Sequence, residues 1–168
     1  MLAISLILIG ILLRFIPHAP NFTPVAAIAL FSGAYLNKKS ALIVPLILMI
    51  ASDAIIGMHN VAVFTWGAFL LITLLGFNLQ KKTGALKMIS FSLVSSLLFF
   101  VVSNFGVWIM GWYPPTLSGL AQCYFMALPF LRDFAFSTLV YSAVFFIAFE
   151  LIARSVKNKK LAAVLLKK

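Results

Sequence analysis

Long apolar runs fill most of this chain, and only short polar segments separate them. Hydrophobic residues make up 64% of the 168 residues, whereas charged residues make up 10%. A soluble domain with this composition would have a largely apolar surface, so lipid must solvate most of the exterior. The length suits one compact bundle of helices and leaves no room for a separate soluble catalytic domain.

The spacing of the polar segments predicts an all-α, polytopic membrane helix bundle that forms a single integral membrane domain over residues 1–168. Thr23 and Pro24 favour a helix start, with a hydroxyl N-cap followed by proline at the first helical position. Residues 119–131 are too few to span and contain Pro129, so they predict a short outer half-helix. About six transmembrane helices are expected, over residues 2–16, 24–36, 40–57, 61–79, 88–111 and 134–153, followed by a basic cytoplasmic tail over 154–168.

The basic residues predict the orientation of the chain. The positive-inside rule places the lysine clusters in the cytoplasm, and all ten lysines and Arg154 then lie inside. Arg14 and Arg132 fall on the other side, and this asymmetry requires both termini to be cytoplasmic. The net charge of +10 therefore reflects membrane topology, and no nucleic-acid partner is expected.

Polar residues outside the lysine clusters gather at the predicted outer ends of the spans. Ionisable groups within apolar spans are costly and tend to face a cavity or a partner. Arg14 and Asp53 could form a structural ion pair or bind a ligand, and Arg132 with Asp133 could form a solvated hinge or a pocket wall. The candidate substrate-binding residues are Arg14, His18, Asn21, Asp53, His59, Asn104, Trp112, Tyr113, Arg132 and Asp133.

Two of these candidates and one pair of small residues have a second interpretation. Trp112 and Tyr113 could stack on a planar ligand or belong to the aromatic belt at the membrane interface. Ala29 and Gly33 have the small-xxx-small spacing that permits close helix approach, either within the protein or to a partner helix in the membrane.

Signatures of catalysis are missing from the sequence. It contains no GxSxG, HExxH or Walker loop, so no enzymatic activity is expected and the chain cannot power transport by itself. His18, His59, Asp53 and Cys123 could supply metal ligands, but their spacing matches no compact metal motif. We therefore expect neither a metal nor another cofactor.

Residues 14–31, RFIPHAPNFTPVAAIALF, resemble the N-terminal signature of a bacterial family of uncharacterised transport proteins. Ser52-Asp53, the segment Asn104-Phe105-Gly106-Val107-Trp108 and the segment Ala127-Leu128-Pro129-Phe130 resemble later parts of that family. The family is similar in size and organisation to substrate-binding S components of energy-coupling factor (ECF) transporters. The resemblance implies a multi-pass protein of the bacterial cytoplasmic (inner) membrane, a vitamin-sized ligand, a membrane coupling subunit and two ATPases. It also implies that Ala29 and Gly33 contact the coupling subunit.

The function predicted from these features is small-solute binding or transport through an outward-facing pocket, with membrane lipid around the protein. One alternative is a structural or scaffolding subunit, in which Arg14 and Asp53 form a buried pair and no pocket exists. The other is an intramembrane enzyme acting on a lipid or isoprenoid, which would need His18, His59 and Asp53 to converge as acid–base groups.

Overall fold

The structure is a computed structural model that describes residues 2–16, 20–79 and 84–155. Within these ranges it is built from helices and contains no strand, which confirms the all-α prediction. The elements are α1 (Leu2–Phe15), α2 (Val25–Tyr35), α3 (Lys38–Ile56), α4 (Ala62–Gly76), α5 (Ala85–Val107), the π-helical turn η1 (Trp108–Trp112) and α6 (Leu117–Ser155).

Three helical segments are long and apolar enough to cross a membrane: Lys38–Ile56, Ala85–Trp112 and Leu117–Ile152. The other three helices are apolar but shorter, with 14 residues in α1, 11 in α2 and 15 in α4. At 1.5 Å per residue, α2 measures about 16 Å, against about 30 Å for the hydrocarbon core of a bilayer. The prediction of six spans is therefore confirmed only in part, since three helices have spanning length.

The predicted half-helix and the last predicted span form one continuous helix, α6, of 39 residues. The prediction of a separate half-helix over 119–131 is therefore wrong. Pro129 lies inside α6, where it removes one backbone hydrogen bond. A proline can kink a helix without ending it, and this one lies in a long apolar helix that packs along α5. Arg132 and Asp133 likewise lie within α6 and do not interrupt it.

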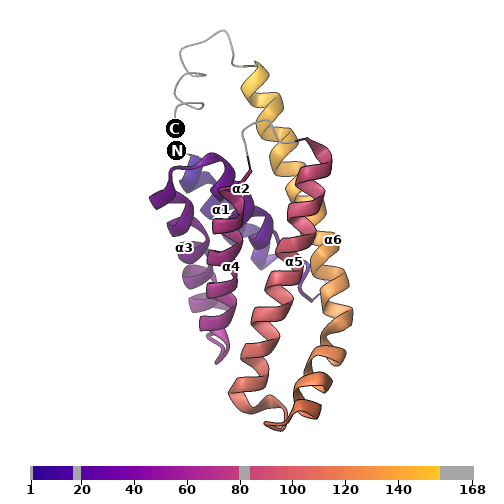
Figure 1. The fold of residues 1–168 in the computed structure, drawn as a ribbon. Coiled ribbons are helices and arrows are strands. Elements are labelled where there is room, and N and C mark those ends of the chain that lie inside the picture. Colours follow the sequence, from indigo (N-terminus) through magenta and orange to yellow (C-terminus); the bar gives the residue numbers. More distant parts are fainter. Residues whose placement is uncertain (1, 17–19, 80–83, 156–168) are drawn as a thin grey trace.

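The helices alternate in direction along the chain, and α5 and α6 form a long hairpin closed by η1 (Figure 1). One end of the molecule carries Lys38, Lys39 and the start of α5, and we call it the lysine end. The opposite end carries the C-termini of α1 and α3 and the loop 57–61 between α3 and α4, and we call it the site end. At the site end the α5–α6 hairpin extends past this loop (Figure 1).

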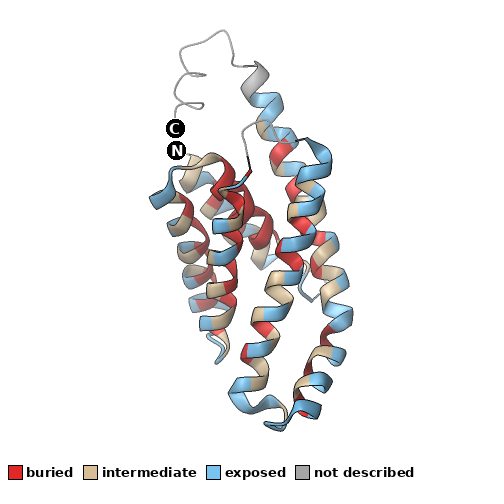
Figure 2. Ribbon diagram, viewed as in Figure 1, coloured by how far each residue is buried: buried red, intermediate tan, exposed pale blue. Residues whose placement is uncertain are grey.

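The core is centred on α2, which contacts each of the other α-helices. Every residue from Val25 to Ala34 is buried, on all sides of the helix (Figure 2). A helix that is apolar all round is expected in the middle of a bundle. Aromatic side chains pack α2 against α6. The Phe31 ring centroid lies 5.3 Å from that of Phe146 and 5.5 Å from that of Phe149.

The close approach of α2 to α4 depends on glycine. A Cβ atom placed on Gly33 would lie 2.3 Å from the carbonyl oxygen of Thr73 and 2.8 Å from the Cα of Gly76. Ala29, one turn earlier, is 0% exposed. Ala29 and Gly33 therefore serve a helix contact within the protein, which was one of the two alternatives. Their assignment to a partner-helix contact is wrong for this structure, because both residues are buried.

The predicted helix cap at Thr23 is also wrong. The residue at the N-cap of α2 is Pro24, and the cap makes no side-chain hydrogen bond. Within the described ranges the Thr23 hydroxyl is buried without a hydrogen-bond partner. The capping interaction at the next helix is instead made by Asn37, whose Oδ1 accepts a hydrogen bond from the Ser40 backbone N–H at 2.9 Å.

Candidate functional site

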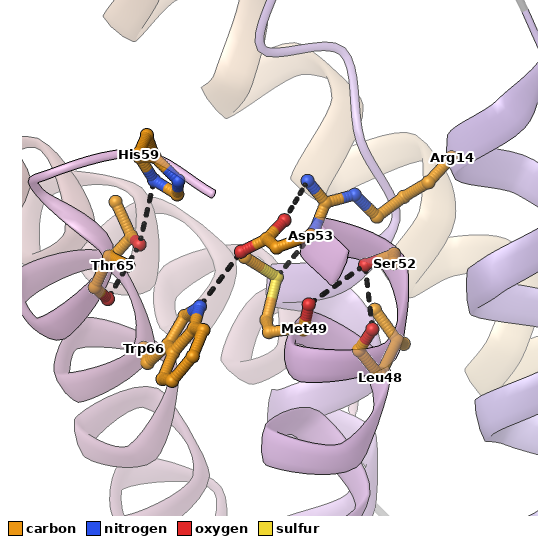
Figure 3. Close-up of polar contacts among 9 residues, drawn as sticks. Arg14, Leu48, Met49, Ser52, Asp53, His59, Thr65 and Trp66 are labelled. Atoms are coloured by element: carbon orange, nitrogen blue, oxygen red, sulfur yellow. Dashed lines mark hydrogen bonds and ion pairs between the residues drawn. The ribbon is translucent and has the colours of Figure 1, made fainter. Parts of the chain in front are cut away.

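Asp53 is the centre of a polar cluster near the site end. Its side chain is 2% exposed, and its Oδ1 atom lies 2.8 Å from Nη2 of Arg14. Its Oδ2 atom accepts a hydrogen bond of 2.9 Å from the indole N–H of Trp66 (Figure 3). Both carboxylate oxygens are thus engaged, one by a residue of α1 and the other by a residue of α4.

The direction of the helices brings these side chains together. Arg14 lies in the last turn of α1 and Asp53 in the last turn of α3, and both helices end at the site end. A carboxylate at a helix C-terminus is unfavourable because the helix dipole is negative there. The Arg14 guanidinium offsets that effect, and its Nη1 atom also contacts Sδ of Met49, one turn before Asp53, at 2.7 Å.

The energetic role of the pair follows from its burial. An isolated charge taken out of water costs several kcal/mol, and a buried ion pair offsets this cost only with good geometry and further hydrogen bonds. Asp53 has both, through Arg14 and Trp66. The arrangement holds the Arg14 side chain, which is 18% exposed, in a fixed position.

Two neighbouring cavities lie beside this cluster. The first, which we call the arginine lobe, has a volume of about 290 Å³. The second, which we call the hairpin lobe, has a volume of about 260 Å³ and is walled in part by α5 and α6. Both are lined by Asn21, His59, Thr65 and Phe99, so they are adjacent. The arginine lobe adds Arg14, Thr23, Val25, Met49, Ile56 and Phe69, and the hairpin lobe adds Val61, Phe100, Ser103, Asn104, Val107, Phe130, Leu131 and Phe134.

Three of the four residues shared by the two lobes come from loops or the first turns of α4, and the fourth, Phe99, comes from the middle of α5. Asn21 lies between α1 and α2 with φ of 61°, a left-handed conformation in which asparagine is enriched. The His59 ring is in the α3–α4 loop, and its Nε2 atom lies 3.4 Å from the Thr65 hydroxyl (Figure 3). These groups add hydrogen-bonding capacity to walls that are otherwise mostly apolar.

Residues 1–161 of the chain match the model of a family of unknown function, DUF6580. The chain belongs to this family. No curated protein and no solved structure gives a match. The DUF6580 match carries no link to S components of ECF transporters or to bacteria, so both of these remain predictions.

The structure of this DUF6580 protein brings five of the ten predicted site residues together. Arg14, Asn21, His59 and Asn104 line one or both lobes, and Asp53 lies behind Arg14. His18 falls outside the described residues.

The remaining predicted residues lie elsewhere in the fold. Trp112 and Tyr113 line a separate open pocket of about 480 Å³ around η1. Arg132 and Asp133 pair with each other at 3.1 Å on α6, with side chains 83% and 32% exposed, and neither lines the two lobes. The prediction that Arg132 and Asp133 form a wall of this site is therefore wrong.

Several site residues of the DUF6580 chain were not predicted. Trp66 was not among the predicted site residues, but its indole N–H donates a hydrogen bond to Asp53. Phe69, Phe99 and Phe134 line the lobes and stack on one another. A single phenylalanine in an apolar run has no sequence signal that separates a cavity wall from ordinary core packing, so these residues could be found only from the structure.

Metal binding has no support within the described part of the chain, where no group of three or more His, Cys, Asp or Glu residues is close enough to hold an ion. Cys123 is buried in α6, and its thiol contacts the carbonyl oxygen of Asn104 at 3.4 Å. Asp53 is engaged by Arg14 and Trp66.

Proposed function

We propose that this protein is a membrane-embedded, non-catalytic subunit that binds a small solute for transport. The observation that carries the proposal is that Arg14 lines a cavity while its counter-ion Asp53 does not. A fixed cationic group at the wall of a mostly apolar cavity is typical of a ligand site, where a few polar groups orient the ligand. The two lobes have a combined size in the range of small-molecule pockets.

In this proposal all six helices cross the membrane and the lysine end faces the cytoplasm. The shortness of α2 is compatible with this topology, because α2 is buried by other helices and does not need to match the bilayer itself. The positive-inside rule supports the orientation, since Lys38, Lys39 and Lys87 share one end with the start of α5. The site would then open on the non-cytoplasmic side of a bacterial cytoplasmic membrane, as the resemblance implies.

The proposal includes an external energy source. The chain has no nucleotide-binding loop, so an ECF-type coupling subunit with ATPases would have to supply the energy. Ala29 is fully buried and Gly33 packs against α4, so such a partner would dock on another surface. The exposed apolar faces of α3, α5 and α6 are available for this contact.

A structural subunit is the second candidate function, and one observation favours it. Arg14 and Asp53 do form the buried ion pair that this alternative requires. The alternative also requires a packed interior, and the two cavities beside the pair do not fit it.

The test is mass spectrometry of small molecules released from the detergent-purified protein. We expect a stoichiometric compound from the wild type and its loss from the double variant Arg14→Met/Asp53→Asn, which removes the cation without leaving an unpaired buried carboxylate. Arg132→Met is the matched control, because it removes an arginine that is paired outside the lobes. Retention of the compound by the double variant would contradict the site assignment, and an empty wild-type protein would favour the structural subunit.

A further inference from the structure

The ligand chemistry can be narrowed from the charges that face the two lobes; this step rests on the proposed function. Arg14 is the one permanently charged residue among the described residues that line them. Its partner Asp53 has a side chain only 2% exposed, with both oxygens engaged. A ligand in the arginine lobe would therefore meet the cation and not the carboxylate, so the lobe favours an anionic group.

The net charge of the Arg14–Asp53 pair limits how many negative charges a bound ligand can carry. Arg14 and Asp53 together are neutral, so a monoanion adds one net negative charge to the site and a dianion adds two. In a poorly solvated cavity, repulsion from Asp53 grows with each added charge. A guanidinium has five N–H donors, and the contacts to Asp53 and Met49 use only two nitrogen atoms. Donors remain for one carboxylate, which a guanidinium binds well through two parallel hydrogen bonds.

A stack of three phenylalanine rings runs past both lobes. Phe69 and Phe99 are stacked with centroids 5.0 Å apart, and Phe99 and Phe134 with centroids 4.3 Å apart. Phe69 lines the arginine lobe, Phe134 lines the hairpin lobe and Phe99 lines both. The three rings come from α4, α5 and α6, so the stack is held by three different helices.

The orientation of the rings in this stack favours a particular shape for the part of the ligand that contacts it. Both faces of the Phe99 ring are covered by its two neighbours, so Phe99 can offer mainly its ring edge to the lobes. The edge of an aromatic ring is electropositive and prefers the π face of another ring in an edge-to-face contact. A flat aromatic body would therefore fit here better than a saturated one of the same size.

We propose that the ligand is a planar aromatic monocarboxylate, with its carboxylate on Arg14 in the arginine lobe and its ring against the Phe69–Phe99–Phe134 stack. Polar substituents on the ring would meet the hydrogen-bonding side chains of His59, Thr65 and Asn104, which line the lobes. The Asn104 side-chain amide donates a hydrogen bond to the Phe100 carbonyl at 2.8 Å through Nδ2, and its side-chain oxygen Oδ1 is the atom that would accept from such a substituent.

The test uses three probes that share one carbon skeleton: 2-naphthoate, its uncharged amide 2-naphthamide, and the saturated acid decahydro-2-naphthoate. The full chain in detergent is unfolded by heat in the presence of each probe at the same concentration. We expect 2-naphthoate to raise the unfolding temperature most. That rise should vanish in Arg14→Met/Asp53→Asn, shrink in Phe99→Leu, and persist in Arg132→Met. If Phe99→Leu still binds both acids but no longer prefers 2-naphthoate to decahydro-2-naphthoate, the preference for an aromatic ring comes from the phenylalanine stack.

Each other outcome overturns a stated part of the proposal. An equal rise with the amide excludes the carboxylate contact, and an equal rise with the saturated acid excludes the ring contact. No rise with any of the three probes overturns the ligand class. The proposed function is judged separately by the compound released from the purified protein. If that compound is lost from the double variant but is aliphatic, uncharged or phosphorylated, the function stands and the ligand class falls.

Discussion

Helices α2 and α6 are both mostly apolar in sequence but have opposite surroundings. The 11 residues of α2 are almost all buried, whereas the apolar window of α6 is 22% buried and that of α5 is 17% buried. Large side chains such as Leu97 of α5 and Phe125 of α6 are 53% and 70% exposed. The comparison teaches that α2 is stabilised by internal packing on every side, while the exposed sides of α5 and α6 need an apolar solvent around them.

The largest expected difference in the free energy of unfolding is between a variant that removes Arg14, the partner of the buried Asp53, and one that removes the exposed Arg132. Arg14→Met leaves the Asp53 carboxylate buried without its cation, and we expect it to lower the free energy of unfolding by about 3–5 kcal/mol. Arg132→Met on α6 should change it by less than about 1 kcal/mol, because exposed pairs contribute little. Chemical unfolding in detergent measures both.

The double variant Arg14→Met/Asp53→Asn sharpens this result. It should recover most of the lost stability, because the asparagine side chain is uncharged and its carbonyl oxygen can still accept the hydrogen bond from Trp66. If the double variant is as unstable as Arg14→Met, the cost comes from lost packing around Arg14 and not from the unpaired charge.

A second comparison makes the same Leu→Ala substitution at a buried position of α2 and at an exposed position of α5. Leu30 of α2 is 0% exposed, so Leu30→Ala should cost about 2–5 kcal/mol through lost contacts and a cavity. Leu97→Ala on α5 should cost under about 1 kcal/mol, because lipid or detergent can fill the vacated space. Equal losses in thermal or denaturant unfolding would mean that the exposed face of α5 is packed against protein in the membrane.

The glycine contact between α2 and α4 gives a third, smaller effect. Gly33→Ala should cost about 1–3 kcal/mol, because its Cβ would press on the Thr73 backbone and force the helices apart. Gly67 lies in α4 with no atom within 4 Å of an added Cβ, so Gly67→Ala should be neutral or stabilise by up to about 1 kcal/mol. The difference between the two unfolding midpoints measures how tightly the bundle is packed.

The smallest predicted effects concern hydroxyls on the buried side of the hairpin. Ser137 of α6 donates to the Phe134 carbonyl at 2.9 Å and lies 3.3 Å from the Thr23 carbonyl of the α1–α2 loop, so Ser137→Ala should cost about 1 kcal/mol. The Ser142 hydroxyl is buried without a partner among the described residues, so Ser142→Ala should be neutral or stabilise slightly. A clear loss in Ser142→Ala would show that this hydroxyl binds something in the membrane-embedded protein.

Five of the ten residues predicted for the site lie at it, and the reason lies in the residue types. Charged and amide groups are costly in apolar spans, so Arg14, Asp53 and Asn104 could be selected as residues that need a partner or a cavity. Arg132 and Asp133 passed the same filter but lie outside the two lobes, where these neighbouring residues of opposite charge pair with each other. The position of a polar residue along the chain did not show whether it lies at the site or pairs with a neighbour on the surface.

Composition and the lysine pattern by themselves determined that this protein is a helical membrane protein, because no soluble fold can carry so much apolar surface. They did not determine how far each helix is buried: α2 and α5 are both strongly apolar, yet α2 is buried from Val25 to Ala34 whereas the apolar window of α5 is 17% buried. Tertiary structure alone decided that Trp66 binds Asp53 and that three phenylalanines stack along the two lobes. The physical reason is that an apolar side chain looks the same in sequence whether it packs on protein, lines a cavity or meets lipid.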